Sequence, residues 1–233
     1  MPAQPHILAL IPARGGSKGI PRKNIVPLLG RPLLSYSVVA AREAACIDRI
    51  IVSTDDGGIA AVAAAWGAEV PFLRPPELAT DTAAGLDVAR HALAWLAKHE
   101  AYIPDIVVEL QPVAPLRLAA DIEGAVALLL ASGADSVVGL TEADHPYYLR
   151  TLDNGVVQPF LPDTPKAFRR QDLPPVYRCN GAIIAVRTPV LCAGSFYGKD
   201  VRGYVMPPER SVDIDTPLDL RLAEALLRER DRD

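Results

Sequence analysis

The stretch LALIPARGGSKGIPRKN, residues 8–24, joins an apolar run of strand length to a loop rich in glycine and cations. Ligands of open α/β sheets bind beyond the carboxyl ends of the parallel strands, and glycines there let backbone N–H groups approach a phosphate. Arg14, Lys18, Arg22 and Lys23 add four cations within ten residues. The stretch therefore predicts a polyphosphate site at the end of the first strand of a parallel sheet.

This loop matches neither standard nucleotide-binding fingerprint. No lysine followed by Ser or Thr stands after a second glycine at Walker spacing, and the GxGxxG pattern is missing. A glycine-rich turn with solvated basic residues is the alternative interpretation of the stretch taken alone.

The rest of the chain alternates apolar runs of strand length with alanine-rich helical patterns. This alternation predicts a doubly wound, mainly parallel α/β sheet covered by helices on both faces. The 233 residues, half of them hydrophobic, suit a single domain, 1–233, with a small appended lobe. Strands are expected in HILALIPA, RIIVST, AEVPFL, DIVVELQ, DSVVGL and GAIIAV, and helices in RPLLSYSVVAAREA, GGIAAVAAAWG, near 83–99, near 119–132 and after residue 216.

The alternation stops after residue 140. Residues 141–178 are rich in proline, aromatic and basic residues. They include LRTLDNGVVQPF, in which Asp153, Asn154 and Gly155 supply turn residues between two short apolar runs. This segment is predicted to form a hairpin within a subdomain that projects from the sheet.

Charge and composition exclude several classes of function. A formal net charge of −4 and an isoelectric point near 5.6 give no basic excess for nucleic acid or an anionic membrane as the main partner. No signal-peptide pattern and no run of eighteen apolar residues is present, so a cytoplasmic protein is expected. Cys46, Cys179 and Cys192 form neither a CxxC pair nor a zinc pattern.

The strongest chemical signal is the DID segment near the end of the chain. In an extended segment the side chains of Asp213 and Asp215 point the same way, so their carboxylates can share one hard cation. Mg²⁺ typically binds one or two carboxylates together with phosphate oxygens and water. The alternative is an exposed strand in which Asp215 or Thr216 caps the last helix. Together with the cationic glycine loop, the DID spacing favours a magnesium site.

Two further segments are expected at the same edge of the sheet. ELQPVAPLR, 109–117, leaves a strand with Gln111 and Arg117, although it could serve only as a strand-to-helix connection. RPPELATDTA, 74–83, is a polar loop in which Asp81 either caps the next helix or contacts a ligand.

Six segments, in the same order, resemble the CMP-sialic acid synthetase family, the cytidylyltransferases that activate sialic acid and related nine-carbon keto sugars. They are IPARGGSKGIPRKN, RIIVSTDD, LRPPELATDTA, LQPVAPLR, YRCNGAI and SVDIDTPLDL, and they extend over nearly the whole chain. The resemblance implies a Rossmann-like nucleotidyltransferase domain whose projecting subdomain, 141–178, mediates a homodimer. It also implies a Mg²⁺-dependent reaction of CTP with a sugar acid that yields a CMP-sugar and pyrophosphate.

The resemblance implies roles for individual residues as well. Nucleotide contacts are expected from Ala13, Arg14, Gly15, Gly16, Lys18, Asn24 and Arg74. Sugar contacts are expected from Gln111, Arg170, Arg178 and Asn180, with Arg170 reaching in from the other subunit. The catalytic set is expected to comprise Arg14, Lys18 and Lys23, which neutralise phosphate charge, and the magnesium ligands Asp213 and Asp215.

This chain departs from the family pattern at the sugar end. Val113 and Ala114 replace two hydroxyl residues, and Ile184 stands where sialic acid enzymes often carry an aromatic residue. A modified acceptor such as legionaminic or pseudaminic acid is therefore consistent with the sequence. Two other functions stay open: an enzyme of the same fold that joins another nucleotide such as GTP to a hexosamine 1-phosphate, and a nucleotide-sugar binding module without turnover.

Overall fold

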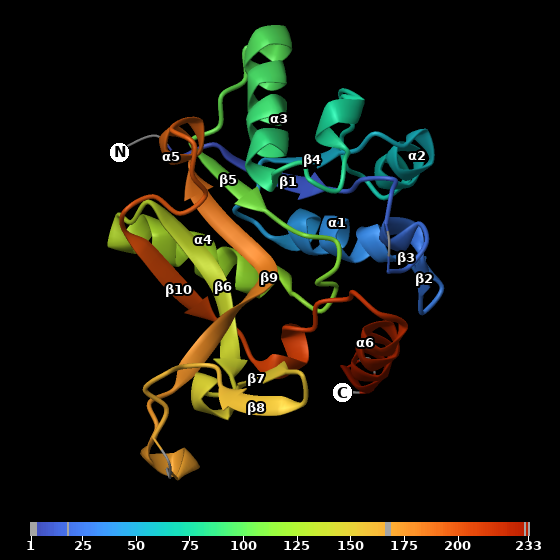
Figure 1. Ribbon diagram of the computed structural model, residues 1–233. Helices are drawn as coiled ribbons and strands as arrows, with labels where there is room; N and C mark the ends of the chain where they lie inside the picture. Colours follow the sequence, from blue (N-terminus) through green and yellow to red (C-terminus); the bar gives the residue numbers. More distant parts are fainter. Residues whose placement is uncertain (1–3, 18, 166–168, 231, 233) are drawn as a thin grey trace.

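The computed structural model describes residues 4–17, 19–165, 169–230 and 232, and its centre is a six-stranded sheet of order β10-β6-β9-β5-β1-β4 (Figure 1). The strands are β1 (Ile7–Pro12), β4 (Arg49–Ser53), β5 (Ile106–Glu109), β6 (Ser136–Ala143), β9 (Val176–Arg187) and β10 (Val201–Val205). β1 runs parallel to β4 and β5, and β10 runs parallel to β6. β9 is antiparallel to both β5 and β6. The mainly parallel sheet confirms the predicted fold class.

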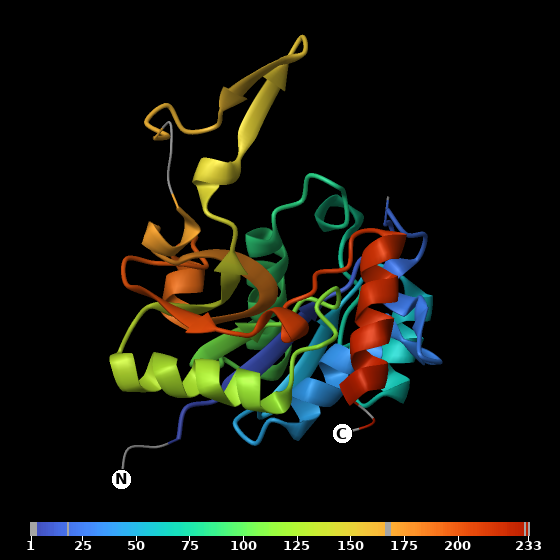
Figure 2. The same cartoon turned by 90° about the horizontal axis from the view of Figure 1, so that it is seen from below.

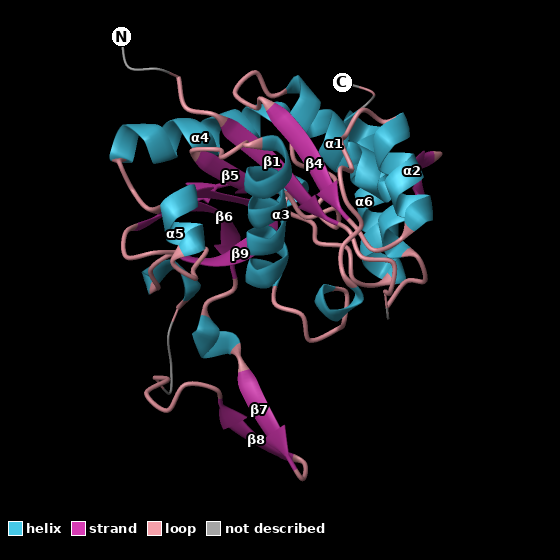
Figure 3. Ribbon diagram, turned by 90° about the horizontal axis from the view of Figure 1, so that it is seen from above, coloured by secondary structure: helices cyan, strands magenta, loops and turns pink. Residues whose placement is uncertain are grey.

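Helices cover both faces of this sheet (Figure 3). They are α1 (Leu33–Glu43), α2 (Gly57–Ala65), α3 (Gly85–Glu100), α4 (Ala119–Ser132), α5 (Thr188–Cys192) and α6 (Pro217–Arg230). Alternate residues of β1 point to opposite faces, so Ala9 and Ile11 pack with α1, α2 and α4, whereas Leu8 and Leu10 pack with α3 and α5. All four side chains are buried, as expected for the centre of a doubly wound sheet.

One predicted strand did not form. AEVPFL makes only two isolated bridges, Glu69 with Ile51 of β4 and Leu73 with Thr54, the residue after β4. Pro71 lies between these bridges and has no backbone N–H to donate to a ladder, so pairing cannot continue through it. The prediction of a strand here was wrong.

The remaining short elements connect the main ones. They are the strands β2 (Pro27–Leu28), β3 (Arg31–Pro32), β7 (Arg150–Asp153) and β8 (Val156–Pro159), and the 3₁₀ turns η1 (Lys23–Ile25), η2 (Pro76–Leu78), η3 (Pro146–Tyr148), η4 (Arg170–Asp172) and η5 (Pro208–Arg210).

A lobe projects from the sheet between the end of β6 and the start of β9 (Figure 2). Within it β7 and β8 form an antiparallel hairpin, which confirms the hairpin prediction. Asn154 and Gly155 at its turn have φ angles of 47° and 81°, the left-handed pair that a two-residue hairpin turn requires.

The last helix is fixed at its start by a reciprocal pair. The Asp219 carboxylate accepts from the backbone N–H of Thr216 at 2.7 Å, and the Thr216 hydroxyl accepts from the N–H of Asp219 at 3.4 Å. Of the two caps considered, Thr216 is therefore the one used. Within the described part of the chain, no helix has the length and apolar character needed to cross a membrane.

Candidate active site

A cavity of about 580 Å³ opens at the carboxyl ends of β1 and β5. Its volume is in the range of small-ligand sites, and its place on the sheet is where open α/β folds bind ligands. Its walls come from the loop after β1, the segment 74–88, the segment 109–113 and the DID segment. Six predicted site residues line it: Arg14, Lys23, Asn24, Arg74, Gln111 and Asp215.

The loop after β1 is tied down by side chains from other segments. The Gly15 N–H donates to Asp55 Oδ1 at 2.9 Å, so this amide is already engaged in the structure. Asn24 is buried, and its side-chain amide donates to the carbonyl oxygen of Arg14 at 2.8 Å. Asn24 therefore holds the backbone that presents the Arg14 side chain to the cavity.

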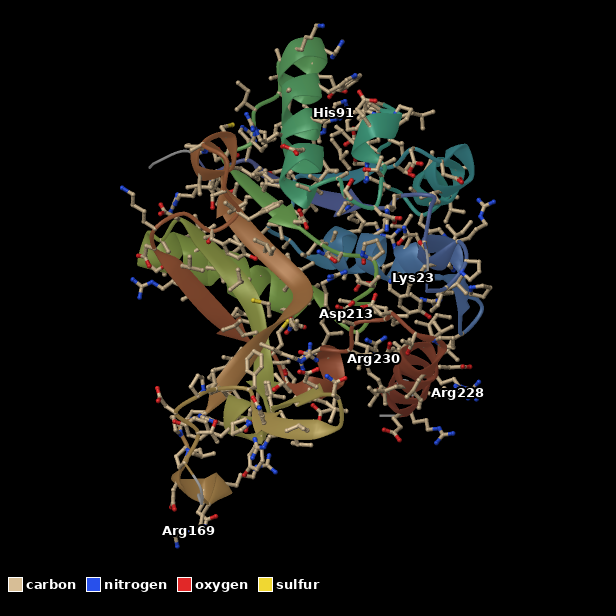
Figure 4. The ribbon with its side chains drawn as sticks, in the orientation of Figure 1. Lys23, His91, Arg169, Asp213, Arg228 and Arg230 are labelled. Carbon is tan, nitrogen blue, oxygen red and sulfur yellow. The ribbon has the colours of Figure 1, made fainter. Side chains whose placement is uncertain are left out.

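The same loop meets the DID segment at a close backbone contact. A Cβ added to Gly19 would lie 2.5 Å from the carbonyl oxygen of Asp215, so only glycine fits there without movement. Lys23 Nζ donates to Asp215 Oδ1 and to the Ile214 carbonyl, both at 2.8 Å. Figure 4 labels Lys23 and Asp213, which come from these two segments. Residues almost two hundred positions apart thus form one wall of the cavity.

Asp213 is the more buried of the two DID carboxylates. Burial, followed by repulsion from Asp215, raises its pKa, while Lys23 and Arg178 oppose that shift. Its Oδ1 atom is buried and has no hydrogen-bond partner among the described residues.

These properties fit a divalent cation, because a cation would relieve the repulsion between the two carboxylates and pair the orphaned oxygen of Asp213. The described residues contain no group of three or more His, Cys, Asp or Glu side chains placed to hold a metal. Phosphate oxygens and water would therefore have to supply the remaining ligands.

Arg14 pairs with a residue of the opposite wall. Its guanidinium lies 2.7 Å from Asp81 Oδ1, which links the loop after β1 to the segment before α3. Asp81 does not cap α3, because the helix starts at Gly85 and its N-cap residue is Ala84, so the capping alternative was wrong. A bound triphosphate would compete with Asp81 for Arg14.

Arg74 is almost fully buried at the wall of the cavity. It donates to the hydroxyl of Ser53 at 3.1 Å, to the Ser53 carbonyl and to the Leu78 carbonyl at 3.4 Å. Burial lowers its pKa, with the nearby Asp55 carboxylate acting in the opposite direction. These bonds join the end of β4 to the start of the segment 74–88, which lines the cavity.

Two residues, Glu109 at the cavity wall and Arg117 behind it, received no specific role from the sequence. Glu109, the last residue of β5, lines the cavity but ends an apolar run and was taken as part of the strand. Arg117 is fully buried, and its guanidinium donates to the carbonyl of Gln111 at 2.8 Å, to the Ala182 carbonyl and to the Ser37 hydroxyl. Burial lowers the pKa of Arg117 to about 9. Arg117 thus fixes the turn that presents Gln111. For Glu109, the feature of the sequence that could have indicated a site residue was a charged side chain inside the apolar run DIVVELQ.

The other predicted residues lie outside this cavity. The Asn180 amide is buried, donates to Ser211 Oγ at 3.0 Å and accepts from the Ala182 N–H at 3.1 Å. Arg178 donates to the Ser211 carbonyl at 3.2 Å and, with Arg170, lines a separate hollow at the base of the lobe. Ala13, Gly15 and Gly16 do not line the main cavity, and Lys18 lies outside the described residues.

Comparison with known sequences shows which family model and which proteins this chain is similar to. The family model described as Cytidylyltransferase matches residues 8–230. CMP-N,N'-diacetyllegionaminic acid synthase of Legionella pneumophila is 36% identical, with 95% of this chain and 96% of that protein covered. Pseudaminic acid cytidylyltransferase of Campylobacter jejuni is 34% identical, with 94% and 95% covered. N-acylneuraminate cytidylyltransferase of Escherichia coli is 34% identical over 97% of this chain, which spans about half of that enzyme (53%).

Solved structures agree on the fold. CMP:2-keto-3-deoxy-manno-octonic acid synthetase, whose structure is described as a complex with CTP, superposes with a TM-score of 0.71 at 18% identity, covering 97% of this chain and 99% of that chain. The 4-diphosphocytidyl-2C-methyl-D-erythritol synthase of Anaerococcus prevotii gives 0.66 at 14% identity, covering 97% and 100%. By its match over residues 8–230 and its full-length relatives, the chain belongs to the cytidylyltransferase family of enzymes.

Proposed function

We propose that this enzyme transfers CMP from CTP to a nonulosonic, sialic-acid-like keto sugar and releases pyrophosphate. The observation that carries the proposal is the wall formed by Lys23 and Asp215, which brings the cationic loop and one aspartate of the DID segment to a cavity that Gln111 also lines. Phosphate-binding cations and a metal-binding pair on one side, with an amide on the other, suit a nucleoside triphosphate that meets a polar acceptor.

The acceptor class rests on the relatives and on the cavity wall. The relatives named above act, by their names, on diacetyllegionaminic, pseudaminic and acylneuraminic acids. Of the two positions where this chain lacks a hydroxyl, Val113 lines the cavity, whereas Ala114 is fully buried and does not. Val113 and Ile184 therefore support an acceptor other than sialic acid itself, such as legionaminic or pseudaminic acid.

In the proposed reaction the anomeric hydroxyl of the sugar acid attacks the α-phosphorus of CTP. A new oxygen–phosphorus bond forms while the bond to pyrophosphate breaks, and water accepts the proton that the hydroxyl loses. Arg14, Lys18 and Lys23 would neutralise charge on the phosphates, and Gln111 would orient the sugar. Arg74 and Asn24 would support the nucleotide side by fixing the two loops that surround it.

Asp213 and Asp215 would hold Mg²⁺ in this proposal. The cation would supply electrostatic stabilisation of the phosphate oxygens when bound. The raised pKa of Asp213 and its unpaired oxygen support this assignment independently of any relative.

We also propose a homodimer that forms through the lobe. Leu149, Leu152, Val156, Val157 and Phe160 are each about half exposed or more, and they gather on the projecting hairpin. Exposed apolar side chains gathered on a projecting arm are typical of a protein interface. In such a dimer Arg170 would reach the partner's sugar site. A cytoplasmic location, where CTP is available, completes the proposal.

Pyrophosphate release with Mg²⁺ tests the function directly. CTP would be paired with N-acetylneuraminic, N,N'-diacetyllegionaminic and pseudaminic acids, and GTP, UTP and ATP with hexosamine 1-phosphates. Release with CTP and one sugar acid is expected. Release only with another nucleotide and a sugar phosphate would replace the proposal with the hexosamine alternative, and nucleotide binding without release under every condition would favour a binding module.

A further inference from the structure

Glu109 is an ionisable side chain that none of the roles above uses. It is only 4% exposed, yet it lines the main cavity. Its Oε2 atom is buried and has no hydrogen-bond partner among the described residues. Buried polar atoms in folded proteins are nearly always paired, so an unpaired carboxyl oxygen at the wall of a ligand cavity points to a partner on the ligand.

The position of Glu109 on the sheet indicates which part of the substrate it meets. β5 lies between β1, which leads into the phosphate-binding loop, and β9. In the strand register Glu109 stands beside Ile184 of β9, and the side chain of Gln111 hydrogen-bonds to its carboxyl group. Glu109 therefore lies beside the two residues associated above with the sugar.

The groups around the carboxyl leave its free oxygen available. The cation that acts on the carboxyl is Arg74, from the loop after β4, but the donors of Arg74 are directed to Ser53 and to the Leu78 carbonyl. Burial raises the pKa of Glu109 to about 7, and the hydrogen bond from Gln111 and the charge of Arg74 reduce the shift without cancelling it. His91, on α3 (Figure 4), interacts with Arg74, and its own pKa is lowered by burial.

We propose that Glu109 is a specificity-determining residue, whose unpaired oxygen accepts a hydrogen bond from an N–H or O–H substituent of the sugar acid. This inference rests on the proposed function, because it assigns the acceptor side of that same site. An ionised carboxylate offers only acceptor atoms, so an amide, amine, amidine or hydroxyl satisfies it. A substituent without a donor would leave the buried oxygen unpaired and would be rejected.

Steady-state kinetics of Glu109→Leu and Glu109→Gln test the inference with whichever sugar acid of the panel supports turnover. Leu removes the acceptor, whereas Gln keeps the shape and one acceptor oxygen. We expect Glu109→Leu to raise the KM for the sugar acid at least tenfold, with the KM for CTP within twofold of wild type, and Glu109→Gln to recover part of the loss. An unchanged sugar KM, or an equal rise in the CTP KM, would overturn the inference.

Substrate analogues identify the donor. Replacing an acylamino group of the accepted sugar acid by hydroxyl tests nitrogen against oxygen, and replacing it by hydrogen removes the donor. At the position that meets Glu109, removal of the donor should abolish or reverse the advantage of wild type over Glu109→Leu. If the difference persists with every donor deleted in turn, the hydrogen bond does not exist.

The pH profile adds a readout that a structural role would not move. Between pH 6 and 8 the ionised fraction of Glu109 rises, so kcat/KM for the sugar acid should increase in wild type relative to Glu109→Gln. Parallel profiles would contradict the inference.

Should Glu109→Leu fail to fold in a melting experiment, the Glu109→Gln profile decides. Failure of wild type to turn over any sugar acid would overturn the proposed function together with this inference, whereas turnover without an effect at Glu109 overturns the inference alone.

Discussion

The cavity wall and the projecting lobe are built in opposite ways. At the wall, short hydrogen bonds and a backbone contact lock Lys23, Gly19 and Asp215 together beside a buried sheet edge. In the lobe, the hairpin residues 149–160 are exposed on all sides, and apolar side chains face outward. The contacts of the wall are made within one chain, whereas the lobe exposes the apolar surface that we propose forms a dimer interface. The charged groups proposed for the reaction and the apolar surface proposed for a dimer therefore lie in different parts of the fold, and Arg170 is the one lobe residue proposed to act in both.

The largest effect is expected at the wall. Asp215→Asn should lower kcat by about 10³-fold or more, because it removes a proposed metal ligand and the charge partner of Lys23. The Asp215 side chain is 73% exposed, so the melting temperature should change little. Pyrophosphate release and a thermal melt check both parts. A near-normal rate would exclude Asp215 as an essential ligand and weaken the contrast with the lobe.

Gly19→Ala tests the backbone contact without changing any charge. The added Cβ would meet the Asp215 carbonyl at 2.5 Å, so the loop or the DID segment must shift, and we expect kcat/KM to fall by roughly 10- to 100-fold. Gly57→Ala is the matched control, because a Cβ there meets nothing within 4 Å. Equal activities of the two variants would show that the wall tolerates movement.

Arg170→Ala asks whether the lobe also takes part in the chemistry. If Arg170 reaches the sugar of the partner's site, the KM for the sugar acid should rise about tenfold, with a smaller effect on the KM for CTP. Arg169→Ala is the neighbouring control, since Arg169 is exposed and pairs with Asp172 at 2.7 Å within the lobe. A larger effect on CTP, or equal effects of the two variants, would remove Arg170 from the sugar site.

The smallest expected effect is the change in folding stability with pH that the buried carboxyl of Glu109 causes. The folded-state pKa of Glu109, about 7, lies above its ordinary value of 4.5, so the unfolded chain releases this proton first and stability falls as pH rises between these values. The full cost above pH 7 is at most about 3 kcal/mol. Glu109→Gln should therefore raise the melting temperature by several degrees at pH 8 and hardly at all near pH 4.5. A constant difference across this range would show that the carboxyl does not titrate as described.

Much of the fold was predictable because the local pattern carries it. The alternation of apolar runs and alanine-rich segments located α4 at 119–132, and the turn residues Asn154 and Gly155 located the hairpin. The antiparallel direction of β9 could not be predicted, because GAIIAV has the same pattern in either direction. The missing strand at AEVPFL shows that one proline outweighs an apolar run.

The sequence indicated which charged residues would lie at the candidate site, but not which of them would pair with one another. The cationic loop and the DID segment were expected at one edge, and the structure joins them through Lys23 and Asp215. The partnership of Arg14 with Asp81 and the burial of Glu109 depend on segments far apart in the sequence, so no local spacing encodes them. Asn180, predicted at the sugar, is engaged with Ser211 and Ala182, and its sugar role stays a prediction.

The contact between Lys23 and Asp215 also determines when this part of the fold can form during synthesis. These residues are 192 positions apart, so at ribosomal rates of about 5–20 residues per second the loop after β1 is made roughly 10–40 s before its partner segment emerges. During that interval the sheet edge can form, but the nascent chain holds the cationic loop without the aspartates. The order of synthesis therefore delays the formation of this wall until residues 214 and 215, just before α6, have been made.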